Sequence, residues 1–234
     1  MRYWLAKNLI VVPLLRLFFR YEVRGHENIP KKGAAIIASN HLAILDSAFV
    51  PGAMRRHVAF LAKEQFFAGK GFVPWVRRSF MGAMGQLEID RGGGSASASS
   101  LGGGASVLRA GKLLGIYPEG TRSPDGRLYR GRTGIARMLL ESGATVLPIA
   151  MIDTDKVLRE GSIFPKLRRV GVVIGEPLDF SRFAGMENDR FVLRSITDEI
   201  MHELSKLSGQ EYVDVYASSM KKSRPAAARR RGRR

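Results

Sequence analysis

The chain has 234 residues, of which 45% are hydrophobic and none is cysteine. This length and apolar content suit one main domain with a substantial core, and the missing cysteines exclude disulfides, a thiol nucleophile and cysteine-ligated metal sites. The net charge of +17 predicts attraction to polyanions, whether anionic lipid, nucleic acid or a phosphorylated substrate, and does not choose among them.

The first 20 residues form a strongly apolar segment that Lys7 and Arg16 interrupt. Its charge-free run, residues 8–15, is far shorter than the roughly 20 residues that a membrane-spanning helix needs. We therefore expect a helical segment that lies in the membrane interface, with Arg16 and Arg20 at phosphate headgroups. Packing against the protein core is the alternative for the same pattern. The side chains expected to enter the acyl region are Trp4, Leu9, Ile10, Leu14, Phe18 and Phe19.

From residue 21 onward, short apolar runs alternate with helical patterns, which predicts an α/β domain with a mixed, largely parallel sheet flanked by helices. The last predicted helix has the clearest apolar stripe, and Asn188 is expected to cap it. Strands are expected at residues 34–39, 57–62, 86–90, 113–117, 145–151 and 170–175. Helices are expected directly after Asp46 and at residues 74–84, 100–110, 133–142 and 188–207. The stripe consists of Phe191, Ile196, Ile200, Leu204 and Leu207.

A polar motif, residues 39–46, directly follows the first of these strands and contains His41 and Asp46. Ligands of open α/β sheets usually bind at the carboxyl ends of the strands. On one continuous helix, residues five apart point about 140° away from each other, so this pair cannot share a helix face. With His41 in a loop and Asp46 in the first turns of the next helix, the carboxylate orients one imidazole nitrogen and leaves the other for a substrate proton.

This pair has the base and the orienting carboxylate of a serine hydrolase but no serine, so the hydroxyl of an acceptor is expected to take the place of the serine. The acyl group then passes directly to the acceptor, without an acyl-enzyme. For an isolated histidine and aspartate with this spacing, a helix-capping role is the alternative.

Two further motifs supply groups that bind anions. Residues 117–123, with the sequence YPEGTRS, follow another apolar strand, and the guanidinium of Arg122 can bind phosphate in a bidentate manner. In the same turn, Gly120 allows close approach of the backbone to a ligand, and Thr121 offers a hydroxyl. Arg91 follows a third strand and provides a second cation for the same anion. A turn with an exposed arginine is the alternative.

Basic residues also gather in a loop and at the end of the chain. The loop at residues 127–132 is expected either to help bind a phosphate of donor or acceptor or to be solvated surface. Residues 216–234 contain no acidic residue and become strongly basic from Lys221 onward, which predicts a disordered polycationic tail. Such a tail suits RNA as well as membranes. The apolar N-terminal segment favours an anionic membrane surface as the partner, and no specific nucleic acid is expected.

Together the motifs resemble those of the glycerolipid acyltransferases typified by 1-acyl-glycerol-3-phosphate acyltransferase, the lysophosphatidate enzyme. The resemblance covers about residues 34–151 and consists of four blocks in the same order. The matching residues are Asn40, His41 and Asp46 of the Asn-His-x4-Asp block, residues 89–91 of the block ending Ile-Asp-Arg, residues 118–122 of the Pro-Glu-Gly-Thr-Arg block, and residues 146–150 of a less specific apolar strand with a central proline.

The resemblance implies that His41 is the general base and that Asp46 orients it. It also implies transfer of a fatty acyl group from acyl-coenzyme A or acyl carrier protein to the free hydroxyl of 1-acyl-glycerol-3-phosphate, which forms phosphatidate. The enzyme is then expected to be peripheral or monotopic on the cytoplasmic face of the cell membrane, with no cofactor and no metal. The residues implied to bind the acceptor are Asn40, Arg91, Glu119, Gly120, Thr121 and Arg122.

In the second block, Leu87 and Glu88 depart from the usual family pattern. The resemblance therefore identifies the type of reaction more firmly than the identity of the acceptor. Glycerol-3-phosphate or another lysolipid is the alternative acceptor, and a noncatalytic protein that binds polyanions or lipid is the alternative class. The expected organisation is a membrane-surface segment at residues 1–20, an acyltransferase domain at 21–215 and the basic tail at 216–234.

Overall fold

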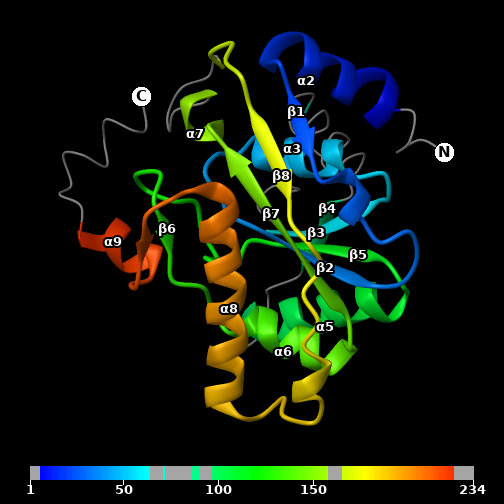
Figure 1. Cartoon of the computed structure of the whole chain (residues 1–234), viewed down its shortest axis with the longest axis vertical. Helices are drawn as coiled ribbons and strands as arrows, with labels where there is room; N and C mark the ends of the chain where they lie inside the picture. Colours follow the sequence, from blue (N-terminus) through cyan, green and yellow to red (C-terminus); the bar gives the residue numbers. More distant parts are fainter. Residues whose placement is uncertain (1–5, 64–70, 72–85, 90–95, 158–164, 224–234) are drawn as a thin grey trace.

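The computed structural model describes residues 6–63, 71, 86–89, 96–157 and 165–223, and within these residues the largest element is a seven-stranded sheet (Figure 1). The strand order across the sheet is β1-β8-β7-β2-β5-β3-β4. The strands are β1 (Glu22–Arg24), β2 (Ala35–Ser39), β3 (Val58–Lys63), β4 (Gln86–Ile89), β5 (Leu113–Ile116), β7 (Thr145–Ile152) and β8 (Gly171–Ile174).

The strand directions confirm the predicted mixed, largely parallel sheet. Strand β2 pairs in parallel with β5 and β7, and β3 pairs in parallel with β4 and β5. Strand β8 runs antiparallel to β7, and β1 follows the direction of β8. All five residues of the central strand β2 are buried, which is why its sequence is an apolar run rather than an alternating one.

Helices cover both faces of the sheet (Figure 1). The segments η1 (Ala6–Val11), α2 (Val12–Phe19) and α3 (Asp46–Ala53) lie over one face, where one cluster of buried apolar residues forms half of the core. On the other face, α5 (Ala96–Arg109), α6 (Gly134–Ser142) and α8 (Arg190–Ser208) enclose the second half. Three short helical segments are η2 (His26–Asn28), α7 (Thr154–Val157) and η4 (Ser181–Phe183). The helix predicted at residues 74–84 lies outside the described residues.

The start of α8 differs from the sequence prediction in two respects. The capping residue is Asp189 and not Asn188, because the Asp189 carboxylate accepts hydrogen bonds from the N–H groups of Phe191 and Val192. The Phe191 side chain is 88% exposed, so it does not belong to the buried stripe. The stripe meets the sheet only from Leu193 onward, one turn into the helix.

The N-terminal segment divides its apolar side chains between the core and the surface. Leu15 and Phe19 are buried, and the Phe19 ring packs edge-on against Phe49 with a centroid distance of 5.5 Å. The prediction that Phe19 enters the acyl region is therefore wrong, and Trp4 lies outside the described residues. Within those residues no helix has both the length and the apolar character needed to cross a bilayer. The large apolar side chains that stay exposed are Leu9, Ile10, Leu14, Leu17 and Phe18.

The C-terminal part of the chain continues beyond the main sheet as an ordered segment. Strand β9 (Tyr212–Val213) pairs in parallel with β6 (Leu128–Tyr129), and helix α9 (Ala217–Ser223) follows. The prediction of a disordered tail from residue 216 is therefore corrected for residues 217–223. The remainder of the predicted tail, 224–234, lies outside the described residues.

Candidate active site

His41 and Asp46 meet where β2 ends and α3 begins, as their spacing predicted. His41 lies in the loop after β2, and Asp46 is the first residue of α3. The Nδ1 atom of His41 is 2.9 Å from the Oδ2 atom of Asp46. If Nδ1 carries the proton, it donates to the carboxylate, and Nε2 keeps a lone pair that can accept a proton. The His41 side chain is 16% exposed, so an external molecule has access to the ring.

The Asp46 carboxylate is held in place by the backbone of the loop that it faces. Its Oδ2 atom accepts hydrogen bonds from the N–H groups of Leu42 at 2.7 Å and Ala43 at 2.8 Å. The carboxylate is fully buried and lies in the first turn of a helix, where the helix dipole favours a negative charge. These contacts fix the carboxylate, so it can orient the His41 ring without moving itself.

Tyr117 supports the His41 ring from one side. The two rings are stacked, with centroids 3.9 Å apart and planes at 13°, and Phe60 stacks on the Tyr117 ring at 5.4 Å. Burial raises the pKa of the Tyr117 hydroxyl well above its usual value, and the negative charge of Asp46 adds to this rise. The phenol therefore stays neutral beside the imidazole. Sequence reasoning did not assign this role, although Tyr117 directly precedes the Pro-Glu-Gly-Thr-Arg block.

The loop after β5 is joined to the loop after β2 through the main chain of His41. The N–H of His41 donates to Oε2 of Glu119 at 3.2 Å, and the His41 carbonyl accepts from the N–H of Ser123 at 2.7 Å. Because β2 and β5 are parallel neighbours, both loops leave the sheet at the same edge. The two sequence motifs therefore form one site.

Glu119 joins the two loops through main-chain hydrogen bonds, and its predicted contact with substrate stays a prediction. The side chain is buried, and its second oxygen, Oε1, accepts from the N–H of Tyr129 at 3.0 Å. Burial raises the pKa of Glu119 to about 7, and the two N–H donors oppose this rise. The carboxyl therefore binds a proton more readily than an ordinary glutamate does.

Asn40 also has a structural role, and its predicted contact with substrate stays a prediction. Its fully buried amide donates to the Met151 carbonyl at 3.0 Å and accepts from the Met151 N–H at 2.7 Å. The same amide nitrogen donates to Oε1 of Gln210 at 2.6 Å. Asn40 thus ties the end of β2 to the end of β7 and fixes the residue that precedes His41.

The turn at residues 120–122 presents the polar groups predicted to bind an anion. Gly120 is exposed and has a φ of +72°, a backbone conformation that residues other than glycine rarely adopt. The Thr121 hydroxyl accepts a hydrogen bond from Nζ of Lys221 at 2.9 Å, and Arg122 is half-buried next to it. Arg91, the second predicted cation, lies outside the described residues.

Comparison with known proteins identifies the family to which this site belongs. The family described as Acyltransferase matches residues 20–152, which contain the His41–Asp46 pair and the turn at 120–122. The chain belongs to the acyltransferase family. It is an O-acyltransferase with an α/β fold in which a largely parallel sheet carries the site.

Two curated relatives and one solved structure illustrate this membership. The 1-acyl-sn-glycerol-3-phosphate acyltransferase of Borreliella burgdorferi is 27% identical over 79% of this chain and 72% of its own. The enzyme with the same name from Bacillus subtilis is 27% identical over 81% of this chain and 88% of its own. The crystal structure of the 1-acyl-sn-glycerophosphate acyltransferase PlsC from Thermotoga maritima, 24% identical, superposes with a TM-score of 0.61 over 86% of this chain and 81% of its own, which shows the shared fold.

Proposed function

We propose that the acyltransferase moves a fatty acyl group from an acyl thioester to the free hydroxyl of 1-acyl-glycerol-3-phosphate and so forms phosphatidate. The observation that carries the proposal is the His41–Asp46 pair, with Nδ1 held at 2.9 Å and the ring partly exposed. The relatives from Borreliella burgdorferi and Bacillus subtilis, named for this acceptor, support the choice of lysophosphatidate.

In the proposed mechanism, Nε2 of His41 removes the proton from the acceptor hydroxyl as the hydroxyl oxygen attacks the thioester carbonyl. The new C–O bond forms, the C–S bond breaks, and the leaving thiolate takes the proton back from His41. Asp46 keeps the ring in one tautomer and stabilises the imidazolium that forms between these steps. Direct transfer is supported by the contacts of His41, because no hydroxyl side chain in the described residues is hydrogen-bonded to Nε2.

The acceptor phosphate is proposed to bind at the turn that carries Thr121 and Arg122, with Arg91 as a further cation. In 1-acyl-glycerol-3-phosphate the free hydroxyl is on the carbon next to the one that carries the phosphate, so base and phosphate site must be close to each other. The hydrogen bond between Ser123 and His41, at 2.7 Å, supports this requirement because it joins the two loops. The proposed donor is acyl-coenzyme A or acyl carrier protein, and no cofactor takes part.

The protein is proposed to work as a peripheral enzyme on the cytoplasmic face of the membrane, where acyl thioesters occur. The exposed apolar side chains of η1 and α2 suit insertion below the headgroups. Arg20, at the end of α2, and the neighbouring Arg168 and Arg169 line a hollow of about 520 Å³ together with Leu17 and Phe18. This hollow lies at the edge of the sheet where β7 ends and β8 begins, the same edge that carries His41.

Product analysis tests the proposed function. Purified protein is supplied with defined acyl-coenzyme A or acyl carrier protein thioesters and with liposomes that contain one acceptor each: lysophosphatidate, another lysophospholipid, or no lipid acceptor with free glycerol-3-phosphate. We expect phosphatidate as the main product, with acylation at the free hydroxyl of lysophosphatidate. Preferential acylation of glycerol-3-phosphate or of a different lysolipid would overturn the assigned acceptor, and no transfer to any acceptor would overturn the proposed reaction.

A further inference from the structure

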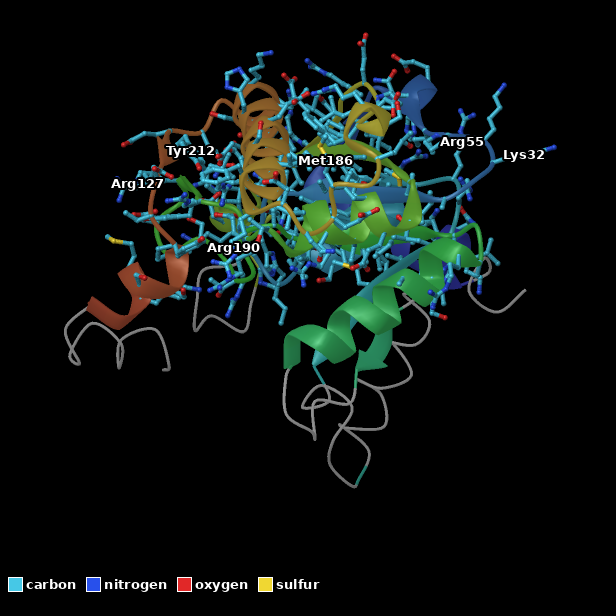
Figure 2. The ribbon with its side chains drawn as sticks, turned by 90° about the horizontal axis from the view of Figure 1, so that it is seen from below. Lys32, Arg55, Arg127, Met186, Arg190 and Tyr212 are labelled. Atoms are coloured by element: carbon cyan, nitrogen blue, oxygen red, sulfur yellow. The ribbon has the colours of Figure 1, made fainter. Side chains whose placement is uncertain are left out.

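The C-terminal segment, residues 210–221, returns the chain to the loops of the site. Gln210 bridges Asn40 and the carbonyl of Gly126, and β9 then pairs with β6. The N–H of Arg130 donates to the Val215 carbonyl at 3.1 Å. Figure 2 shows Arg127 and Tyr212 on this side of the molecule, close to α9, and Lys32 on the opposite side. Specific main-chain and amide contacts, and not charge alone, therefore fix the position of the segment.

The side chain of Lys221, on α9, contacts the turn at residues 120–122. Its Nζ atom donates to the Thr121 hydroxyl at 2.9 Å, and the side chain is half-buried. Burial raises the pKa of Glu119, which accepts from the N–H of His41, and the charge of Lys221 opposes part of this rise. The ammonium therefore acts electrostatically on the loop that carries His41.

Arg132 is a second cation at the same turn, and α9 helps to hold it. The Arg132 guanidinium lies over the Tyr216 ring at 5.1 Å and donates to the Ser218 hydroxyl at 3.1 Å. The main-chain N–H of Arg132 donates to the Pro118 carbonyl at 2.9 Å. A Cβ atom on Gly120 would lie 2.9 Å from Nε of Arg132, so the Arg132 side chain lies directly beside this glycine. Within the described residues the contacts of Arg132 are to neutral groups, so its charge is not neutralised by a carboxylate there.

We propose that Lys221 and Arg132, together with Thr121, bind the phosphate monoester of the acceptor. This inference rests on the proposed function because it names two further ligands for the same substrate. Both cations converge on the turn at residues 120–122, whose loop is bonded to His41 through Ser123. A phosphate one carbon away from the reacting hydroxyl has to bind near that loop, whereas the phosphates of a coenzyme A donor are many bonds away from its thioester. Helix α9 is thus part of the active site.

Steady-state kinetics of Lys221→Met test the inference. Loss of one charged hydrogen bond to the phosphate should raise the KM for lysophosphatidate about tenfold, with kcat within about twofold of the wild type and an unchanged KM for the acyl donor. Transfer to 1-acylglycerol, which has no phosphate, should not change. Lys221→Arg should recover most of the loss, because it keeps the charge. Lys32→Met is the matched control, since it removes the same charge from an exposed lysine on the opposite side of the molecule.

Changes in the two KM values can overturn the inference. One such result is a Lys221→Met enzyme with the acceptor KM of the wild type, and another is a rise in the KM of the acyl donor in place of the acceptor. Circular dichroism melts of each variant establish that the compared proteins are folded. A purely structural role of Lys221 would change transfer to the acceptors with and without phosphate by the same factor, and this result would also count against phosphate binding.

A binding experiment separates this inference from the proposed function. Titration of the wild-type chain with sn-glycerol 3-phosphate should show binding that Lys221→Met weakens about tenfold and Lys32→Met leaves unchanged. If these results hold while no acceptor is acylated, the proposed function fails and the phosphate site stands. If lysophosphatidate is acylated while Lys221→Met binds and reacts like the wild type, the proposed function stands and this inference fails.

Discussion

The imidazole of His41 lies flat against the phenol ring of Tyr117, with ring centroids 3.9 Å apart and an angle of 13° between the planes. Asp46 holds the edge of the imidazole through Nδ1, and Tyr117 supports its face. The ring is therefore restrained in two directions before any substrate binds. Such preorganisation of a general base keeps its free nitrogen directed at one position, the one that the acceptor hydroxyl must occupy.

Removal of the stacked ring should slow the reaction. Tyr117→Leu is expected to lower kcat about tenfold, because an aromatic pair contributes about 0.5–1.5 kcal/mol beyond its buried area. Tyr117→Phe keeps the ring and should retain most of the activity. The measurement is kcat and KM for both variants, with thermal melts to compare folding. Equal loss of kcat in the leucine and phenylalanine variants would contradict a positioning role for the stacked ring.

Glu119 should make the stability of the protein depend on pH. Its pKa rises from an ordinary 4.5 to about 7 on folding, so the folded state binds the proton more tightly than the unfolded state. The resulting stabilisation is complete below pH 4.5 and is lost as the pH rises through 7, with a total of about 3 kcal/mol. Glu119→Gln does not titrate, so the free energy of unfolding of the wild type should fall relative to this variant between pH 5 and 8. A difference that stays constant across that range in urea titrations would contradict the raised pKa.

Much of the fold and the His–Asp geometry was predictable from local patterns. The runs of β2 and β5 are continuously apolar because both faces are buried, and polar residues directly follow each run. Strand β6 has two residues and pairs with β9, far along the chain, so no periodicity revealed it. Helix α9 has the alanine, serine and lysine composition of a tail, and its contacts with Thr121 and Arg132 appear only in the folded chain.

The roles of two motif residues could not be read from the sequence. Asn40 and Glu119 are polar, stand beside His41 or in the anion-binding block, and were therefore expected to contact substrate. In the structure they bond backbone groups of Met151, Tyr129 and His41, and Asn40 also donates to the side chain of Gln210. Such hydrogen bonds between distant parts of the chain cannot be read from sequence spacing. The burial of both side chains likewise depends on the tertiary structure.

Replacement of Gly120 by alanine should affect stability only modestly but should clearly weaken binding of the acceptor. Gly120→Ala introduces backbone strain at a φ of +72° and places Cβ 2.9 Å from Nε of Arg132. We expect the strain to lower the free energy of unfolding by about 1 kcal/mol. Displacement of the Arg132 guanidinium should raise the KM for the acceptor roughly tenfold. Gly111→Ala is the matched control, because its φ is +68° and, among the described residues other than its chain neighbours, no atom lies within 4 Å of the new Cβ. Similar acceptor KM values for the two alanine variants would contradict a role of the Gly120 turn in binding the phosphate.

Exposed leucines of the N-terminal segment should carry the membrane binding. Leu9 and Leu17 are 64% and 74% exposed, and replacement of both by glutamine should reduce partitioning to anionic vesicles about a hundredfold. Phe191→Gln changes an even more exposed apolar side chain in the first turn of α8 and should have little effect, because that end of α8 lies far from α2 (Figure 1). Cosedimentation with liposomes is the measurement. Unchanged partitioning of the double variant would show that another surface binds the membrane.

The most direct test of general-base catalysis is acyl transfer by His41→Ala, with Asp46→Asn beside it. A histidine base contributes about 10²- to 10⁴-fold, so His41→Ala should keep the circular dichroism spectrum of the wild type and lose at least about a hundredfold in phosphatidate formation from saturating lysophosphatidate and acyl thioester. Asp46→Asn should be similarly impaired, because the imidazole loses its orienting carboxylate. A folded His41→Ala enzyme with near-normal turnover would contradict the assignment of His41 as the base.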